Sequence, residues 1–204
     1  MIGLYVVLPQ FLVTRLAPQI PASQIGFVPL PLLVIPTPLP TPLPTPSPTP
    51  GLVPVTIIIP KLEIKTAVEL VGLTPTNNMD VPKDAANVGW YEHGPRPGEQ
   101  GNAVMTGHYD TVTGRPAIFY YLKKLAPGDE VEVISNNAVK NIFVVTEVAT
   151  IPYDKFPSDF VFKSKPGRNL NLITCDGIWD RQKRIYSDRI VVYTTLKEAS
   201  GGSL

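Results

Sequence analysis

The chain has 204 residues and a formal net charge of +1, and its charges and prolines are unevenly distributed. Residues 1–60 contain a single charged side chain, Arg15, and 14 of the 24 prolines lie between Pro9 and Pro54. So many prolines exclude a packed domain in this region, because each one fixes φ and removes a backbone donor. Residues 61–204 carry 17 basic and 17 acidic side chains, and such a neutral domain lacks the basic surface that binds nucleic acid.

Residues 1–60 divide into an apolar segment and a linker. Residues 1–35 have neither an unbroken run of about 20 apolar residues for a membrane span nor the basic n-region of a signal peptide. We interpret them as a degenerate export or anchor segment that would associate the protein with a membrane. Residues 36–54 contain a proline at nearly every second position, which favours an extended, semi-rigid polyproline II spacer. Residues 55–198 are expected to form the folded domain, and residues 199–204 a tail.

Short apolar, β-branched runs separated by turn residues dominate the folded domain and predict strands. We expect strands at residues 56–59, 64–70, 103–107, 130–135, 141–151, 171–174 and 189–195. Many short strands with little helix between them favour an antiparallel barrel or a sandwich. Helical signal is confined to a short turn at residues 82–89 and to residues 117–125, where apolar side chains recur at helical spacing.

Cys175 is the only cysteine of the chain, which excludes an intramolecular disulfide and a cysteine-based zinc cluster. With two histidines and scattered acidic residues, the sequence predicts neither a metal site nor a cofactor. Residue statistics favour a small buried hydrophobe at this position. A reactive thiol is the alternative, and it would require charged or basic neighbours.

Three predicted strands place such neighbours at their ends. The run AVMTGH closes on His108, the run LNLITC closes on Cys175, and the run RIVVY opens with Arg189. If these strands are adjacent, the three side chains meet at one rim of the sheet. A thiolate is a nucleophile, an imidazole serves as general acid and base, and a guanidinium stabilises an oxyanion.

These runs resemble the motifs of sortases, the cysteine transpeptidases of bacterial cell surfaces. The matching stretches are VMTGH (104–108), LITCD (172–176) and RIVVY (189–193), in the family's order of His, Cys and Arg. The runs VGWYEHGPRPG, GHYD and PAIFYYLKKLAPGD resemble class F sortases in particular. The resemblance implies a fold dominated by β-structure, an eight-stranded β-barrel with short helices.

The resemblance also implies an activity, a substrate and a location. Cys175 would attack the Thr carbonyl of a Leu-Pro-x-Thr-Gly sorting signal on a secreted protein and form a thioacyl-enzyme. An amine of the cell wall or of a lipid-linked precursor would then resolve the thioester, at an extracytoplasmic, cell-surface or membrane-associated site. The alternative is a non-catalytic module that binds the wall or a peptide through the same barrel and keeps Cys175 buried and inert.

The resemblance assigns the catalytic roles to His108, Cys175 and Arg189. Arg184 is a second candidate for the arginine, since class F sequences often carry one nine residues after the cysteine. We favour Arg189, because a strand start is more rigid than the loop expected between Asp176 and Asp188.

The sequence also suggests roles for other residues near the motifs, with two alternatives for Asp110 and for Thr174. His93 is expected to be a loop residue. Asp110 is expected either to orient the imidazole of His108 or to form a turn. The hydroxyl of Thr174 could face the substrate or be satisfied within its strand. The long connection at residues 152–169 resembles the loop that determines specificity in sortases, and connections of such length are often functional.

Overall fold

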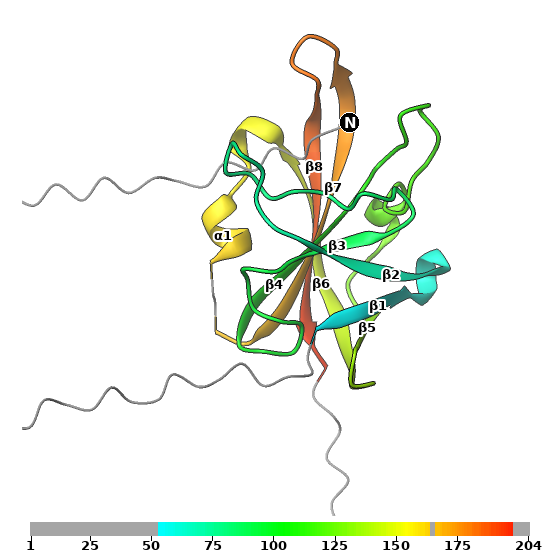
Figure 1. Ribbon diagram of the computed structural model, residues 1–204, viewed down its shortest axis with the longest axis vertical. Coiled ribbons are helices and arrows are strands. Elements are labelled where there is room, and N and C mark those ends of the chain that lie inside the picture. The colour runs from blue at the N-terminus through cyan, green and yellow to red at the C-terminus, as the bar shows by residue number, and fades with distance from the viewer. Residues whose placement is uncertain (1–52, 164–165, 198–204) are drawn as a thin grey trace, which may run out of the picture. The chain divides into compact units, whose positions relative to one another are not determined.

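The apolar runs of the sequence form eight strands that close into a barrel in the computed structural model, which describes residues 53–163 and 166–197 (Figure 1). The strands are β1 (Pro54–Ile59), β2 (Ile64–Val71), β3 (Val88–Tyr91), β4 (Gly101–Gly107), β5 (Glu130–Ser135), β6 (Lys140–Pro152), β7 (Arg168–Asp180) and β8 (Ile185–Leu196). The helices are short: α1 (Ser158–Phe162) and the 3₁₀ turns η1 (Pro60–Leu62), η2 (Leu122–Lys124) and η3 (Tyr153–Lys155). The segment 1–35, nearly all of the linker 36–54 and the tail 199–204 lie outside the described residues.

Around the barrel the strands follow the order β1-β2-β3-β4-β7-β8-β6-β5, and β5 pairs with β1 to close it. Closure leaves no unpaired sheet edge. The expected eight-stranded barrel with short helices is therefore confirmed. The expectation of a purely antiparallel sheet is wrong, because β2 pairs with β3 and β4 pairs with β7 in parallel. Neighbouring parallel strands must be joined by a long crossover connection. Residues 72–87 form this connection between β2 and β3. The segment that contains the β5–β6 hairpin forms it between β4 and β7.

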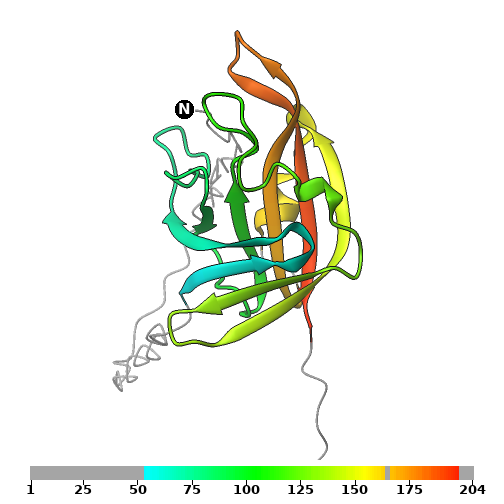
Figure 2. The same cartoon turned by 90° about the vertical axis from the view of Figure 1, so that its right-hand side faces the viewer.

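The strands β4 and β7, which lie side by side (Figure 2), are buried on both faces, β4 along its whole length and β7 through its central residues. Apolar residues of all eight strands fill the interior, and β7 contributes Leu170 and Leu172 to it. The alternate residues Ile173 and Cys175 point outward and pack in a second, smaller group, which we call the outer-face cluster. Its buried members are Val71, Met79, Val104, Val161, Ile173, Cys175, Tyr186 and Val191. Burial on both faces explains why residues 170–175 of β7 are all uncharged and do not alternate between apolar and charged side chains.

Residues 82–89 do not form the expected turn of helix. Residues 82–87 form turns, and the segment then enters β3 at Val88. The carboxylate of Glu69 on β2 accepts hydrogen bonds from the backbone N–H groups of Lys83 and Asp84, at 2.8 and 3.3 Å, and from the side chain of Asn87 at 2.9 Å. These bonds hold the segment against β2 in place of helical bonds.

The expected helix at residues 117–125 is reduced to the single 3₁₀ turn η2. The backbone N–H groups at its start are bound elsewhere: Ala117 donates to the Tyr109 carbonyl and Phe119 donates to the His108 carbonyl, each at 3.0 Å. These tertiary bonds override the helical periodicity. They also fix the residues that follow β4, including His108.

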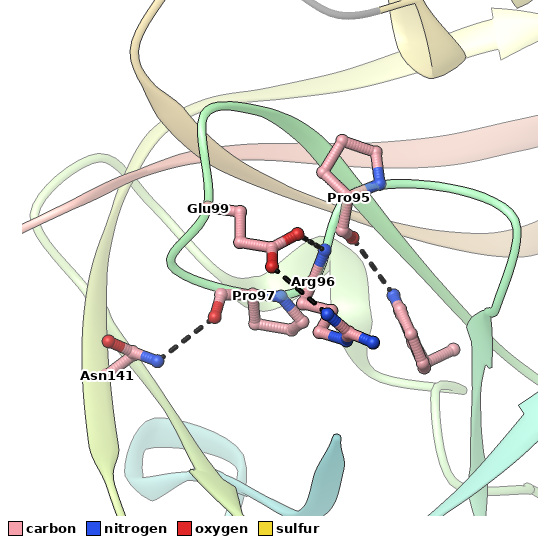
Figure 3. Close-up of polar contacts among 6 residues, drawn as sticks. Pro95, Arg96, Pro97, Glu99 and Asn141 are labelled. Atoms are coloured by element: carbon pink, nitrogen blue, oxygen red, sulfur yellow. Dashed lines mark hydrogen bonds and ion pairs between the residues drawn. The ribbon is translucent and has the colours of Figure 1, made fainter. Parts of the chain in front are cut away.

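The connection between β3 and β4 contains the second part of the first run that resembles class F sortases, and it lies at the strand ends opposite Cys175. Figure 3 shows its polar contacts: Arg96 pairs with Glu99 at 3.4 Å, and the amide of Asn141 donates to the Pro97 carbonyl at 3.1 Å. Gly98 has φ of 96°, and a Cβ there would lie 2.8 Å from the Asn141 amide. The positive φ and the nearby side chain of Asn141 therefore explain the glycine at position 98.

Replacement of Glu69 by Gln is expected to destabilise the barrel at neutral pH by about 1 kcal/mol, the usual net value of such hydrogen bonds. Burial alone would raise the pKa of Glu69, but the bonds from Asn87, Lys83 and Asp84 and the charge of Lys83 together lower it. A lowered pKa in the folded state stabilises the fold above the pKa of the unfolded chain, and this contribution is lost as the pH falls through the folded-state pKa. Urea unfolding at pH 7 and at acidic pH measures the difference.

The control for this prediction is Glu63→Gln, at an exposed carboxylate in the neighbouring turn after η1. A cost of Glu69→Gln that stays constant down to acidic pH would contradict the role of the carboxylate charge.

Candidate active site

The ends of β4 and β7 are joined by side-chain hydroxyls. Thr174 donates to the Gly107 carbonyl at 2.9 Å, and Thr106 donates to the Ile173 carbonyl at 3.3 Å. A Cβ at Gly107 would lie 2.6 Å from the ring of Phe119, so glycine is required where that ring packs against the strand. The hydroxyl of Thr174 is thus satisfied within the sheet. The result is that His108 follows β4 directly beside Cys175 on β7.

Cys175 and Arg189 are directly opposite each other in the antiparallel pair of β7 and β8. Opposite residues of such a pair project from the same face of the sheet, with Cβ atoms about 4.5–5.5 Å apart. Both side chains face outward, away from the barrel interior, and Cys175 is 6% exposed. The strand register therefore fixes the thiol beside a guanidinium.

Arg189 is 1% exposed and only partly satisfied. Its Nη1 donates to the backbone carbonyls of Tyr186 and Asp188, at 3.1 and 2.8 Å. The guanidinium carbon lies 4.8 Å from the ring centre of Tyr153 in η3, an arrangement that favours a cation. Within the described residues, Nε and Nη2 are buried and have no hydrogen-bond partner. Buried donors of this kind are rare and costly, so two unpartnered guanidinium nitrogens beside a thiol indicate a place for an acceptor atom.

His108 is half-buried, and its Nε2 lies 2.9 Å from the Pro82 carbonyl. A carbonyl can only accept, so Nε2 carries a proton and Nδ1 is the basic nitrogen of the neutral ring. His108 and Cys175 line one cavity of about 10 Å³, together with Val81, Thr106, Gly107, Tyr109, Asp110 and Tyr186. This volume is about that of one water molecule. The structure thus brings the expected thiol and imidazole to the same small space.

The expectation that Asp110 orients the imidazole of His108 is wrong. Its Oδ2 accepts a hydrogen bond of 2.5 Å from the hydroxyl of Tyr186, and its Oδ1 is buried without a partner among the described residues. Burial raises the pKa of Tyr186, and the carboxylate of Asp110 raises it further. Tyr186 therefore remains a hydrogen-bond donor at every working pH.

The surroundings of Cys175 shift the pKa of its thiol in opposite directions. Burial raises the pKa of the thiol, the nearby charge of Arg189 lowers it, and the charge of Asp110 raises it. The net shift is upward, so the resting thiol is protonated at neutral pH. A proton acceptor such as the imidazole of His108 is consequently needed to generate the thiolate.

The segment between β6 and β7 covers the outer face of the sheet next to Cys175. It contains η3 and α1, and Val161, Phe156 and Phe162 pack against the outer-face cluster. Asn171 on β7 donates to the Val161 carbonyl at 2.8 Å, which attaches α1 to the strand that carries the cysteine. Tyr153 in this segment also contacts Arg189. The segment thus belongs to the same outer-face cluster as Cys175 and contacts Arg189 through Tyr153.

The other residues that the sequence singled out lie away from this cavity. Arg184 is exposed in the turn of the β7–β8 hairpin, with φ of 56°. The expected loop between Asp176 and Asp188 is in fact mostly strand, since β7 extends to Asp180 and β8 begins at Ile185. His93 is an exposed loop residue whose ring meets Tyr91 edge-on at 5.6 Å. Tyr186 and Tyr153 gave no signal in the sequence, and both lie in segments that were expected to be loops.

The described residues contain no cluster of three or more His, Cys, Asp or Glu side chains that could hold a metal ion. In the same part of the chain, no helix is long and apolar enough to span a bilayer.

The sortase domain is the family whose sequence model matches this chain, over residues 57–197. No curated protein matches it significantly.

Solved sortase structures share the fold at low sequence identity. Sortase C-1 from Actinomyces oris is 20% identical, with a TM-score of 0.56 over 71% of this chain and 74% of that chain. A sortase D5 transpeptidase from Clostridium perfringens is 21% identical, with a TM-score of 0.52 over 71% of this chain and 79% of that one. Sortase A from Corynebacterium diphtheriae is 15% identical, with a TM-score of 0.54 over 74% of this chain and 63% of that one. These neighbours are named as classes A, C and D, so they do not support class F specifically.

Alkylation of native Cys175 by iodoacetamide is expected to follow a titration midpoint above that of a cysteine in a short unstructured peptide, because burial raises the pKa of the thiol. Asp110→Asn should move the midpoint to lower pH, and Arg189→Gln should move it to higher pH. Mass spectrometry of the intact protein follows the reaction, and the single cysteine makes the signal unambiguous.

Arg184→Gln is the matched control, since it removes the same charge from the exposed hairpin turn. Its midpoint should equal that of the unmodified protein. Identical shifts for the two arginine variants would contradict a local effect of Arg189 on the thiol.

Proposed function

The chain belongs to the sortase family, and from this we propose that it is a cysteine transpeptidase that acts through Cys175, His108 and Arg189. The observation that carries the proposal is the buried guanidinium of Arg189, which stands opposite Cys175 and keeps two donors unpartnered. Our sequence-based expectation of sortase motifs gives the same three residues.

The first step is the attack of the Cys175 sulfur on a peptide carbonyl. Because the resting thiol is protonated, Nδ1 of neutral His108 accepts its proton as the sulfur approaches the substrate. The carbon–sulfur bond forms, and the carbonyl oxygen becomes an oxyanion. The imidazolium then donates its proton to the leaving amine as the peptide bond breaks, which leaves a thioacyl-enzyme.

Arg189 is proposed to stabilise the oxyanion of this step. Donors that are preorganised toward the developing charge lower the barrier because they need no rearrangement during the reaction. The bonds from Nη1 to two backbone carbonyls and the contact with Tyr153 hold the guanidinium in place. Nε and Nη2 remain available for the substrate oxygen. An oxyanion there would also satisfy two groups that are otherwise costly to bury.

We propose that the substrate is a sorting signal of Leu-Pro-x-Thr-Gly type on a secreted protein, and that an amine of the cell wall or of a lipid-linked precursor accepts the acyl group. This assignment follows from the sequence motifs and family membership. The β6–β7 connection, which packs in the same outer-face cluster as Cys175, supports a peptide groove on the outer face of the sheet. An extracytoplasmic location follows from the same family membership, and class F assignment depends on the sequence motifs alone.

A second candidate function is supported by the burial of Cys175, which is 6% exposed and has a raised thiol pKa. In that case the barrel would bind a wall component or a peptide without chemistry. An inert module has no need of a buried arginine with two unpartnered donors, which favours the enzyme. Alkylation separates the two: an inert thiol reacts only after denaturation, whereas an active one reacts in the native protein and more slowly when His108 is replaced.

Incubation with a pool of Leu-Pro-x-Thr-Gly peptides and a glycine-based amine is expected to give cleavage between Thr and Gly, a covalent adduct on Cys175, and an amide product. Cys175→Ala should form no adduct, and His108→Ala should lose most turnover with its fold intact. Arg189→Ala should lower kcat/KM by about 10²–10³-fold, the usual effect of losing an oxyanion donor. Mass spectrometry reports the adduct and both products.

Arg184→Ala is the control for the arginine and should act at the unmodified rate. A crippling effect of Arg184→Ala beside a nearly silent Arg189→Ala would overturn the assignment. Acid product alone, at every amine concentration, would mean that water is the acceptor and that the protein is a hydrolase.

A further inference from the structure

The cavity beside Cys175 contains an unused anionic acceptor. Asp110 lines the same small cavity as Cys175 and His108. Its Oδ1 is buried and has no hydrogen-bond partner among the described residues. A buried carboxylate oxygen without a donor is costly. The cavity is about 10 Å³, enough for one group of the size of water.

The carboxylate is held in place from its other side. Tyr186 donates its hydroxyl to Oδ2 at 2.5 Å, while the backbone carbonyl of Tyr186 accepts from Nη1 of Arg189 at 3.1 Å. One tyrosine therefore fixes the positions of both Asp110 and Arg189 with respect to the sulfur. With Oδ2 occupied, Oδ1 is the atom that is left for a ligand.

The chemistry of the cavity restricts that ligand. It must donate hydrogen bonds, have about the size of water, and carry a charge that complements a carboxylate. A primary ammonium group meets all three conditions. Acyl transfer also requires an amine at this place, because by microscopic reversibility the entering amine occupies the position that the leaving amine has vacated, next to the general acid.

We propose that Asp110 is the acceptor-binding residue of the transpeptidation step, with Oδ1 receiving the ammonium group of the incoming amine next to the thioester on Cys175. This inference rests on the proposed function. It adds a role for a residue outside the set of Cys175, His108 and Arg189. It also specifies the acceptor as a cationic primary amine.

The attack of the acceptor amine begins with neutral His108, which has given its proton to the leaving amine. His108 takes one proton from the ammonium bound at Asp110, and the freed nitrogen attacks the thioester carbonyl. The carbon–nitrogen bond forms, the carbon–sulfur bond breaks, and the sulfur of Cys175 leaves as a thiolate. The nitrogen loses a second proton to solvent, so an amide, an imidazolium and a thiolate result. Asp110 undergoes no bond change.

The test measures the ratio of amide to acid that forms when the acyl-enzyme reacts with amine or with water. This ratio does not depend on the rate at which the acyl-enzyme forms. Leu-Pro-x-Thr-Gly peptides acylate the enzyme at pH 7, and the amount of amide relative to acid is followed against the concentration of glycylglycinamide. Most of this amine is protonated at pH 7, since α-amino groups have a pKa of about 7.7–8.0. Asp110→Asn should raise the amine concentration that gives equal products by about ten-fold, as expected for loss of a charge-assisted hydrogen bond.

Two controls isolate the charge of the amine and the position of the carboxylate. Hydroxylamine is largely uncharged at pH 7, and its competition with water should be unaffected by Asp110→Asn. Asp176 follows Cys175 in the sequence, but its carboxylate is paired with Lys123 at 3.1 Å. Asp176→Asn should therefore leave the ratio of amide to acid with glycylglycinamide unchanged. Tyr186→Phe should shift this ratio in the same direction as Asp110→Asn, by a smaller factor.

An unchanged ratio of amide to acid in Asp110→Asn would overturn the inference. So would equal shifts with glycylglycinamide and hydroxylamine, which would mean that Oδ1 holds only a structural water. A parent enzyme that forms neither amide nor acid would contradict the proposed function itself, and the role of Asp110 with it.

Discussion

The pairing of Cys175 with Arg189 across β7 and β8 is the constraint on which the site depends. The closed barrel fixes the register of these two strands, and alternation along each strand directs both side chains to the outer face. A shift of β8 by one residue would turn the guanidinium into the barrel interior. The parallel contact of β4 with β7 then brings His108 to the same rim. Three side chains far apart in sequence thus meet through strand order alone.

Opposing electrostatic influences act on the sulfur in this arrangement. Burial and the charge of Asp110 raise the pKa of the thiol, while Arg189 lowers it. In the proposed mechanism, a protonated resting thiol makes activation of the nucleophile depend on His108. The same burial keeps the dielectric constant low around Arg189, where an oxyanion gains most from two fixed donors. In the proposed mechanism, restraint of the resting nucleophile and stabilisation of the reacting carbonyl thus both arise from burial.

Much of the barrel could be predicted from the sequence, because strands buried on both faces read as apolar runs that end at His108 and Cys175. The parallel pairings could not be predicted, since strand order depends on contacts across the whole chain. The helical periodicity of residues 117–125 was misleading because Ala117 and Phe119 donate to carbonyls of the β4 rim. Tyr186 gave no signal, since its hydroxyl meets Asp110 only when the hairpin folds over the end of β4. Local propensity was thus overridden where long-range hydrogen bonds were available.

A crystal structure of the protein alkylated at Cys175 by a Leu-Pro-x-Thr chloromethyl ketone would test the central claim most directly. In this adduct a methylene group separates the sulfur from the ketone, and the ketone oxygen stands in for the substrate oxygen. We expect a hydrogen bond to it from Nε or Nη2 of Arg189, with Nη1 still bound to the carbonyls of Tyr186 and Asp188. An oxygen turned away from Arg189, with both of its donors still unpartnered, would contradict the account.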